Sequence, residues 1–392
     1  MFTNRTAMSG RHFLQIPGPT NVPDSILRAI NAPTIDHRGP EFAALTLDIL
    51  DKLPRVFQTQ GPVIIFPASG TGAWEAALVN CLSPADKILM CETGHFAKGW
   101  GRLANKIELN AEIIPTDWRQ GADPNAIKTR LEKDVDHLIK AVCVVHNETS
   151  TGVVSDIKAI RSAINQTNHP ALLMVDTISS LASLDYRHDE WGVDVTVAGS
   201  QKGLMLPPGL SFNAISAKAL QASKQSTLPN AYWDWDDILA SNKEGQFPYT
   251  PSTNLLYGLK TALDMLLEEG LENVFSRHLR LAEAARCAVR AWGLEILCQN
   301  ADRYSNSLTA VLVPDGHDAD QLRKIILDNF NMSLGNGLGQ LSGKVFRIGH
   351  LGDLNELSLI GTLGGVEMGL KLAQIPHKRG GAQAAIDFLA AS

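Results

Sequence analysis

Short apolar runs alternate with longer amphipathic segments over much of the chain, from Gly61 to Ile215. The apolar runs are Val63–Phe66, Lys87–Cys91, Ala141–Val145, Ala171–Val175 and Val193–Ala198. Runs of this length predict strands that are buried on both faces, and the amphipathic segments between them predict helices. The pattern is therefore typical of an α/β fold with a largely parallel sheet.

The pattern changes after about Pro251. Helical spacing dominates LLYGLKTALDMLLEEG and VFSRHLRLAEAARCAVRAWG, and strand-like runs follow at Ser307–Val313 and Lys344–His350, before a long helix expected from Asn355. These elements predict a smaller α+β unit, with the boundary between the two units inside a helix. The expected division is an N-terminal arm, a large domain and a small C-terminal domain, at residues 1–20, 21–275 and 276–392.

Composition excludes several classes of protein. The 392 residues are 44% hydrophobic and 19% charged, which is enough apolar material for a sizeable core and excludes a disordered or collagen-like chain. The formal net charge is −6, without a long run of either sign. We therefore expect neither nucleic acid nor an anionic membrane surface as a partner.

The five cysteines are spread through mostly apolar stretches without a close pair. This usage favours a reducing compartment and argues against a disulfide or zinc framework, so we expect no metal site. The first residues lack the apolar core of a signal peptide, and no window approaches the ~20 apolar residues of a membrane span. We expect a cytoplasmic protein, in which Met8 could be the natural start.

Small polar residues follow the first apolar run. Ser69, Gly70 and Thr71 come just before a predicted helix, where exposed backbone N–H groups can hold a phosphate monoester. A plain N-cap, in which Ser69 satisfies the first helical turn, explains the same residues. Taken alone, this turn favours the cap.

Two further strand ends carry ionisable residues. Asp176 directly follows Ala171–Val175, where it could cap a turn or face a cationic ring nitrogen. Lys202 lies in an uncharged segment, GSQKGLMLPPG, after the Val193–Ala198 run. Burial would lower the pKa of this lysine and make its neutral amine a nucleophile. A phosphate cradle, a carboxylate and an imine-forming lysine are together what pyridoxal 5′-phosphate requires.

Two signals near the C-terminus have competing interpretations. The glycine-rich segment Gly335–Lys344 fails the spacing of a nucleotide-binding P-loop and is better explained as a flexible turn. Arg347 lies in an apolar strand, where a guanidinium is costly unless it pairs with an anion. It is either part of an internal salt bridge or a clamp on a substrate carboxylate.

Several motifs, in this order, resemble those of class V aminotransferases, and among them the serine–glyoxylate and alanine–glyoxylate enzymes. They are IPGPTNVP, SGTGAWEAALVN, HNETSTGV, VDTISSL, GSQKGLMLPPG, FPYTP, EEGLENVFSRH and GKVFRIGHLGD. The resemblance covers nearly the whole chain. It implies the fold type I architecture of pyridoxal-phosphate transferases, a large domain with a mostly parallel seven-stranded sheet and a smaller C-terminal α+β domain.

The resemblance also implies roles for residues that match the family motifs. Lys202 would bind the cofactor aldehyde as a Schiff base and then shuttle a proton, and Asp176 would pair with the pyridine nitrogen. The phosphate would be held by Ser69, Gly70, Thr71 and Gln201.

Other matched positions surround the cofactor and the substrate. Phe96 falls where the family stacks an aromatic ring, often tryptophan, on the cofactor, and Thr149 would lie near its ring hydroxyl. Arg347 would bind the α-carboxylate, with the Gly18 turn closing over it. In the family, the segment that matches Tyr249 and Thr250 reaches the phosphate of the neighbouring subunit, and some relatives place the tyrosine where this chain has Phe247.

The implied activity is transfer of an amino group from a small L-amino acid to glyoxylate, giving glycine and a keto acid. Serine, which yields hydroxypyruvate, is the first choice of donor, and aspartate and alanine remain alternatives. Aspartate would need a second cation, for which His37 and Arg38 are candidates.

Two other functions are alternatives to an aminotransferase activity. A lyase of the cysteine desulfurase type shares the fold but needs a nucleophilic cysteine, and Met332–Phe346 contains none. A non-catalytic sugar- or peptide-binding protein would have little use for Lys202. The resemblance also implies a homodimer or a dimer of dimers.

Overall fold

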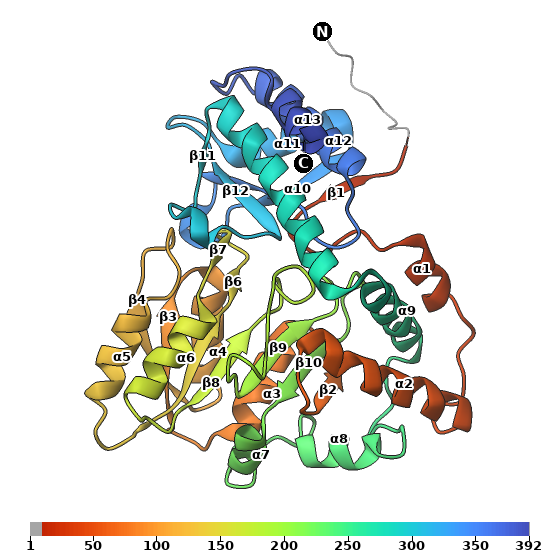
Figure 1. Cartoon of the computed structure of the whole chain (residues 1–392), viewed down its shortest axis with the longest axis vertical. Coiled ribbons are helices and arrows are strands. Elements are labelled where there is room, and N and C mark those ends of the chain that lie inside the picture. The colour runs from red at the N-terminus through yellow and green to blue at the C-terminus, as the bar shows by residue number, and fades with distance from the viewer. Residues whose placement is uncertain (1–9, 392) are drawn as a thin grey trace.

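The structure is a computed structural model that describes residues 10–391, so Met8 lies outside the described residues. Figure 1 shows two bodies, one above the other: a large sheet flanked by helices, and a smaller sheet with its own helices. The longest helix, α10 (Leu271–Trp292), runs from the lower body into the upper one (Figure 1).

The large sheet has seven strands in the order β2-β10-β9-β8-β5-β3-β4. Their bounds in this order are Val63–Phe66, Ser211–Ile215, Val195–Gly199, Leu172–Asp176, Ile139–Val145, Lys87–Glu92 and Asn110–Pro115. The strands are parallel except β10, which pairs antiparallel with β2 and β9. The predicted mostly parallel seven-stranded sheet is therefore confirmed.

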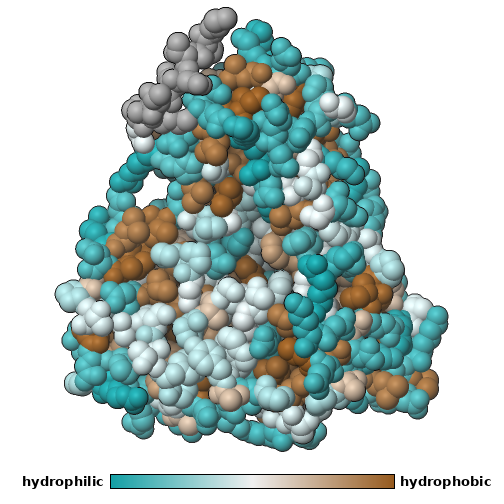
Figure 2. Space-filling view, turned by 180° about the vertical axis from the view of Figure 1, so that it is seen from behind, coloured by the Kyte–Doolittle hydropathy of each residue, from teal (hydrophilic) through white to brown (hydrophobic). Residues whose placement is uncertain are grey.

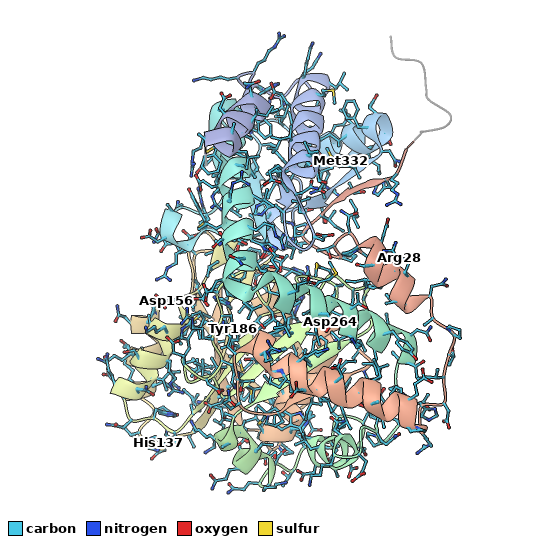
Figure 3. The ribbon with its side chains drawn as sticks, turned by 45° about the vertical axis from the view of Figure 1, so that its right-hand side comes forward. Arg28, His137, Asp156, Tyr186, Asp264 and Met332 are labelled. Carbon is cyan, nitrogen blue, oxygen red and sulfur yellow. The ribbon has the colours of Figure 1, made fainter. Side chains whose placement is uncertain are left out.

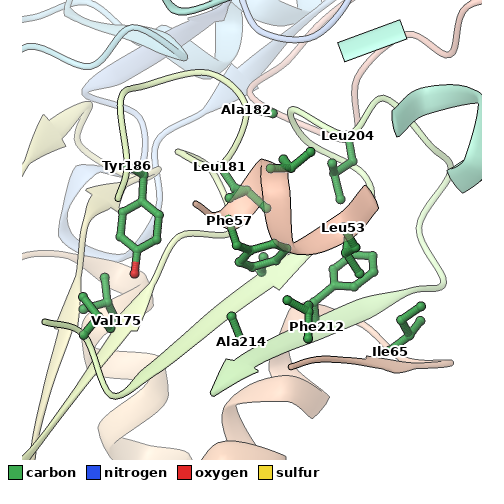
Figure 4. Close-up of a cluster of buried hydrophobic side chains, with 14 of the residues drawn as sticks. Leu53, Phe57, Ile65, Val175, Leu181, Ala182, Tyr186, Leu204, Phe212 and Ala214 are labelled. Carbon is green, nitrogen blue, oxygen red and sulfur yellow. The ribbon is translucent and has the colours of Figure 1, made fainter. Parts of the chain in front are cut away.

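Each face of this sheet packs against its own hydrophobic core, because successive strand residues point to opposite faces. Val63 and Ile65 of β2 belong to one core, whereas Ile64 and Phe66 belong to the other. In the first core, Figure 4 shows Leu53 and Phe57 of a covering helix reaching toward Phe212 of β10. This double burial explains why the strands are apolar runs without alternation.

Helices of the larger body cover both cores and connect the strands. Their bounds are α1 Asp24–Ile30, α2 Pro40–Phe57, α3 Gly70–Cys81, α4 His95–Lys106, α5 Pro124–Glu132, α6 Ile157–Gln166, α7 Ala217–Ser223, α8 Trp235–Asn242 and α9 Thr253–Glu269. A short hairpin of β6 (Asn147–Glu148) and β7 (Val153–Val154) follows β5.

The small sheet takes its first strand from the other end of the chain. Its order is β1-β13-β14-β12-β11, with bounds Phe13–Gln15, Met332–Asn336, Val345–Gly349, Leu308–Leu312 and Glu295–Ile296. β1 pairs parallel with β13, and Gln15 Nε2 donates to the carbonyl of Gly349 at 2.9 Å. The start of the chain is thus part of the C-terminal sheet.

The helices beside the small sheet differ in one respect from the prediction. Their bounds are α10 Leu271–Trp292, α11 Ala319–Phe330, α12 Glu356–Leu372 and α13 Gly381–Ala391, with single 3₁₀ turns at Ala301–Arg303 and Gly339–Leu341. The long helix expected from Asn355 is two helices, separated by a segment with Pro376, which cannot continue a helix. The expected domain boundary at residue 275 falls inside α10, and the division into domains stays a prediction.

The surface carries apolar residues in separate patches. On the face shown in Figure 2, brown residues lie in several groups among teal and white ones. Among residues 10–391, none of the helices combines the length and the apolar character that a bilayer crossing needs. The expected cytoplasmic location stays a prediction.

Candidate active site

A cavity of about 260 Å³ lies beyond the carboxyl ends of β8 and β9, the edge where ligands bind in open parallel sheets. It is lined by Gly18, Pro19, Ser69, Gly70, Thr71, Trp74, Phe96, Val145, Asn147, Thr149, Asp176, Ile178, Gln201, Lys202 and Pro208. Most of the residues singled out in the sequence meet here, although they come from six separate segments.

Asp176 is the last residue of β8 and is 3% exposed. Its Oδ1 accepts a hydrogen bond from the backbone N–H of Ile178 at 2.7 Å, and its Oδ2 accepts one from Nε1 of Trp74 at 2.8 Å. Burial raises the pKa of the carboxyl to about 7, and these two donors oppose that rise. Asp176 can therefore hold a proton between its carboxylate and a basic nitrogen in the cavity.

Lys202 follows β9 and is 8% exposed. Its Nζ donates to the carbonyl of Pro17, and among residues 10–391 no carboxylate forms an ion pair with it. Burial, and to a smaller extent the positive charge of Arg347, lower the pKa of the amine to about 7, and the charge of Asp176 opposes this shift. A substantial fraction of the amine is therefore neutral near pH 7 and able to attack a carbonyl carbon.

Gly18 is required where the N-terminal segment crosses Lys202. Its φ is +111°, and a Cβ at this position would lie 2.5 Å from Nζ of Lys202. Only glycine combines that backbone conformation with so close an approach. The Gly18 turn therefore lies against the Lys202 side chain, and its closing over the substrate carboxylate stays a prediction.

The first turn of α3 supplies a cradle for an anion. Ser69 is the N-cap residue, but its side chain accepts no capping hydrogen bond, so its hydroxyl is not used by the helix. The side-chain oxygen of Gln201 is buried, and no hydrogen-bond partner for it exists among residues 10–391. Because an amide can present either its oxygen or its NH₂ group, Gln201 is able to donate to an anion beside the α3 N-terminus. Together these groups favour the phosphate interpretation over a plain N-cap.

Phe96 forms one wall of the cavity and is held by a residue that the sequence analysis missed. Glu148 of β6 is fully buried, and its carboxylate accepts from the backbone N–H groups of Phe96 at 3.3 Å and of Ala97 at 3.1 Å. A carboxylate at the start of α4 satisfies N–H groups that have no partner within the helix. Glu148 therefore fixes the backbone that presents the Phe96 ring.

Arg347 of the small sheet lies next to the cavity, because it donates to the lining residue Thr149, but it is not itself among the lining residues. Its guanidinium donates to the backbone carbonyls of Thr149 at 2.6 Å and Asn336 at 2.7 Å, and it is 6% exposed. Among the described residues no carboxylate lies within ion-pair distance of it, which argues against the internal salt bridge considered from the sequence. Burial lowers the pKa of Arg347 to about 10, so it remains a cation at neutral pH. A buried cation held only by carbonyls is suited to bind an anion.

Thr149 contacts the site in two ways. Its carbonyl accepts from Arg347, and its Oγ1 donates to Oγ of Ser179 at 2.7 Å. The residue is buried and lines the cavity, and its expected place near a ring hydroxyl stays a prediction.

Some predicted residues do not line this cavity. Tyr249 stacks on Tyr232 with ring centroids 4.5 Å apart, and its hydroxyl is buried without a partner. Thr250 is exposed, as is Arg38. His37 is not among the lining residues either. The roles expected for these residues stay predictions, because one chain alone does not bring them to the site.

A second cavity, of about 570 Å³, lies at the opposite edge of the large sheet. Its lining includes His137, Lys140 and Lys218, and none of the predicted site residues. His137 is labelled in Figure 3 at the end of the molecule far from the small sheet. Across residues 10–391, no group of three or more His, Cys, Asp or Glu side chains is arranged to hold a metal ion.

Two lining residues were missed, although signals for both exist in the sequence. Trp74 lies four positions after Gly70, which places both on one face of α3. Asn147 comes two residues after the end of β5, at the same sheet edge as the other strand ends. The rule that selects Asp176 and Lys202, a polar residue close after a buried strand, also selects Asn147.

Comparison with known proteins gives consistent matches over nearly the full length. Residues 13–348 match the family model described as aminotransferase class-V. The serine–glyoxylate aminotransferase of Arabidopsis thaliana is 47% identical over 96% of this chain and 94% of its own. The L-aspartate–glyoxylate aminotransferase of Paracoccus denitrificans is 42% identical over 96% of both chains.

A solved structure agrees with these matches. The crystal structure of pyridoxamine–pyruvate aminotransferase from Mesorhizobium loti has a TM-score of 0.90 and 28% sequence identity, covering 97% of both chains. The predicted fold class is thereby confirmed. By the match of its sequence and its fold, the chain belongs to the class-V aminotransferase family.

Proposed function

We propose that this protein is a pyridoxal-phosphate-dependent aminotransferase that moves the amino group of L-serine to glyoxylate. The observation that carries the proposal is the meeting of Lys202, Asp176 and the α3 N-terminus in one cavity. Relatives at 47% and 42% identity named as glyoxylate aminotransferases support it.

The residues present fit the parts of pyridoxal phosphate. The unused Ser69 hydroxyl, the α3 N-terminus and the unpartnered Gln201 amide would hold the phosphate. Asp176 would face the ring nitrogen, and Phe96 and Thr149 would flank the ring. When bound, the cofactor supplies an aldehyde for amines and a ring that accepts electrons from the substrate Cα.

The chain's own residues then position the substrate and move its proton. Arg347 binds the α-carboxylate with two N–H donors and thereby orients the Cα–H bond. Lys202 Nζ, of which a substantial fraction is neutral near pH 7, would accept the proton from the substrate Cα and later give it up again. Asp176 keeps the ring nitrogen protonated throughout. Because the same residues act on donor and acceptor in turn, ping-pong kinetics are expected.

The charges around the cavity favour a donor with a neutral side chain. Within this chain the cations at the site are Lys202 and Arg347, and both have assigned roles. A donor such as aspartate would place a second carboxylate in the cavity, and among residues 10–391 no arginine or histidine and no lysine other than Lys202 lines that cavity. Serine and alanine carry no such charge.

The test compares amino donors with purified enzyme and glyoxylate. Serine should give the highest kcat/KM, and Lys202→Ala should fold normally but lose nearly all turnover. The Lys218→Ala variant, which alters a lysine in the distant cavity, serves as the control and should keep full activity. A higher kcat/KM for aspartate would contradict the choice of donor, and an active Lys202→Ala enzyme would contradict the whole proposal.

We also infer that the active unit is a homodimer or a dimer of dimers. Thr250 and the stacked Tyr232–Tyr249 pair lie outside the cavity of their own chain, and part of this segment is exposed. A second copy that uses this surface would bring Thr250 to a neighbouring phosphate site. Shared sites of this kind require symmetric association.

A further inference from the structure

Both oxygens of the Asp176 carboxylate are held by N–H donors from different elements. The backbone N–H of Ile178 binds Oδ1 at 2.7 Å, and the indole N–H of Trp74, from α3, binds Oδ2 at 2.8 Å. Trp74 is 5% exposed and Asp176 is 3% exposed, so water does not compete for either group. The carboxylate therefore has one rotational setting in which both bonds form.

A second tryptophan fixes the plane of the first. Trp74 stacks on Trp100 of α4 with centroids 5.9 Å apart and an interplanar angle of 13°. Trp100 is fully buried, yet its indole N–H has no hydrogen-bond partner among the described residues. The two indoles differ in two respects, because Trp74 lines the cavity and donates to a carboxylate, whereas Trp100 does neither.

The charged and titratable groups around Asp176 shift the pKa of its carboxyl in opposite directions. Burial and the charge of Glu148 raise the pKa of Asp176, whereas the Ile178 and Trp74 donors and the charge of Lys202 lower it. His146, whose backbone N–H donates to the Asp176 carbonyl, has its own pKa lowered to about 4 by burial and stays neutral. Trp74 is therefore one of the few groups that favour the ionised carboxylate.

We propose that Trp74 is a positioning residue, whose N–H keeps the Asp176 carboxylate ionised and turned toward the ring nitrogen of the cofactor. The ring itself belongs to the proposed function. The bond between the indole and the carboxylate does not depend on that function, and it can be tested in the full-length apoprotein.

The first experiment uses the wild-type apoprotein with ¹⁵N-labelled tryptophan side chains. One indole N–H resonance should move as Asp176 ionises at about pH 7, and that response should be absent in Asp176→Asn. Because this measurement needs no change at Trp74, it does not depend on how a Trp74 variant folds. If no indole resonance follows such a titration, the proposal is wrong.

The second experiment compares Trp74→Phe with Trp100→Phe by titrating each apoprotein with pyridoxal phosphate. Loss of a charge-assisted hydrogen bond should raise the Kd of Trp74→Phe about ten- to a hundredfold. Trp100→Phe, which loses only packing and an unpaired N–H, should change it by no more than about threefold. In an Asp176→Asn background, Trp74→Phe should add little further loss.

An equal rise of the Kd in Trp74→Phe and Trp100→Phe would mean that Trp74 contributes only packing, and it would overturn the proposal. A wild-type protein that binds no pyridoxal phosphate would instead contradict the proposed function. In that case the indole titration would still decide whether Trp74 holds the carboxylate.

Discussion

Burial has a different consequence for each charged side chain at the site. It brings the pKa of Asp176 and that of Lys202 to about 7, so both groups are balanced between charged and neutral forms near physiological pH. Arg347 keeps its charge because its pKa falls only to about 10. The two groups that exchange protons can therefore change their charge near neutral pH, whereas the group that binds the substrate carboxylate stays charged.

Lys202 should destabilise the folded apoprotein in acid. Its folded pKa is below its unfolded pKa, so the cost of burying the charge is fully present below about pH 7 and disappears as pH rises toward the unfolded pKa. Lys202→Met should thus raise the free energy of unfolding by roughly 1–4 kcal/mol at about pH 6 and by much less at about pH 10. Urea denaturation at the two pH values measures this, and a pH-independent difference would contradict it.

Arg347→Leu should weaken substrate binding without weakening cofactor binding. Loss of the bidentate clamp should cost about 2–4 kcal/mol, which raises the KM for donor and for glyoxylate on the order of a hundredfold. The control is Arg286→Leu, because Arg286 is equally buried but pairs with Glu283 at 2.8 Å. That variant should lose stability and keep its KM. Steady-state kinetics and a pyridoxal phosphate titration separate the two outcomes.

Helix ends determine much of the site geometry. The start of α3 faces the cavity with an unused Ser69 hydroxyl, and the start of α4 is held by Glu148. Other helices begin with a side-chain cap, as at α12, where the Asn355 side chain accepts from the N–H of Ser358 at 2.9 Å, whereas α9 begins at Ser252 without such a bond, as α3 does at Ser69. At α3 the usual stabilising bond is absent, and the hydroxyl is left for a ligand.

Ser69→Ala and Asn355→Ala should therefore have opposite effects. Ser69→Ala should change the free energy of unfolding of the apoprotein by less than about 0.5 kcal/mol but raise the Kd for pyridoxal phosphate about tenfold. Asn355→Ala should cost about 1 kcal/mol of stability and leave the Kd unchanged. Thermal unfolding and cofactor titration of both variants check this, and a large stability loss in Ser69→Ala would restore the plain N-cap interpretation.

The molecule brings its site together from both bodies of Figure 1. Arg347 belongs to the small sheet, Lys202 and Asp176 to the large one, and the Gly18 turn to the segment after β1. Met332, labelled in Figure 3, marks the strand of the small sheet that pairs with β1. Thr250 would come from a third source, a second copy of the chain.

Subunit mixing tests whether Thr250 acts at the site of a neighbouring copy of the chain. Lys202→Ala and Thr250→Trp should each be inactive alone, but a mixed dimer should recover activity if Thr250 acts in trans, because one of its two sites then has both native residues. Mixing Lys202→Ala with Asp176→Asn is the control and should recover nothing, since both residues belong to the same chain's cavity. No recovery with Thr250→Trp after verified subunit exchange would contradict a role in trans.

Much of the fold and site could be predicted because parallel strands end at one edge. Asp176 and Lys202 were found from the apolar runs before them, and Arg347 from a charge inside an apolar strand. Glu148 was missed because the backbone N–H groups that it binds are 51 and 52 residues away in sequence, and no local pattern indicates such a pairing. The position of Trp74 on the same face of α3 as Gly70 can be read from the sequence, but its bond to Asp176, 102 residues away, cannot. The break between α12 and α13 was missed although Pro376 signals it.

The pairing of β1 with β13 has a consequence for the order of biosynthesis. Phe13 aligns with Met332, so β1 is synthesised more than three hundred residues before its partner strand. The two strands can pair only after β13 has also left the ribosome. Until then the emerging chain carries an unpaired edge strand, and the Gly18 turn has no fixed place over Lys202. The larger body can fold earlier, but a competent site arises only when the last part of the chain closes over the first.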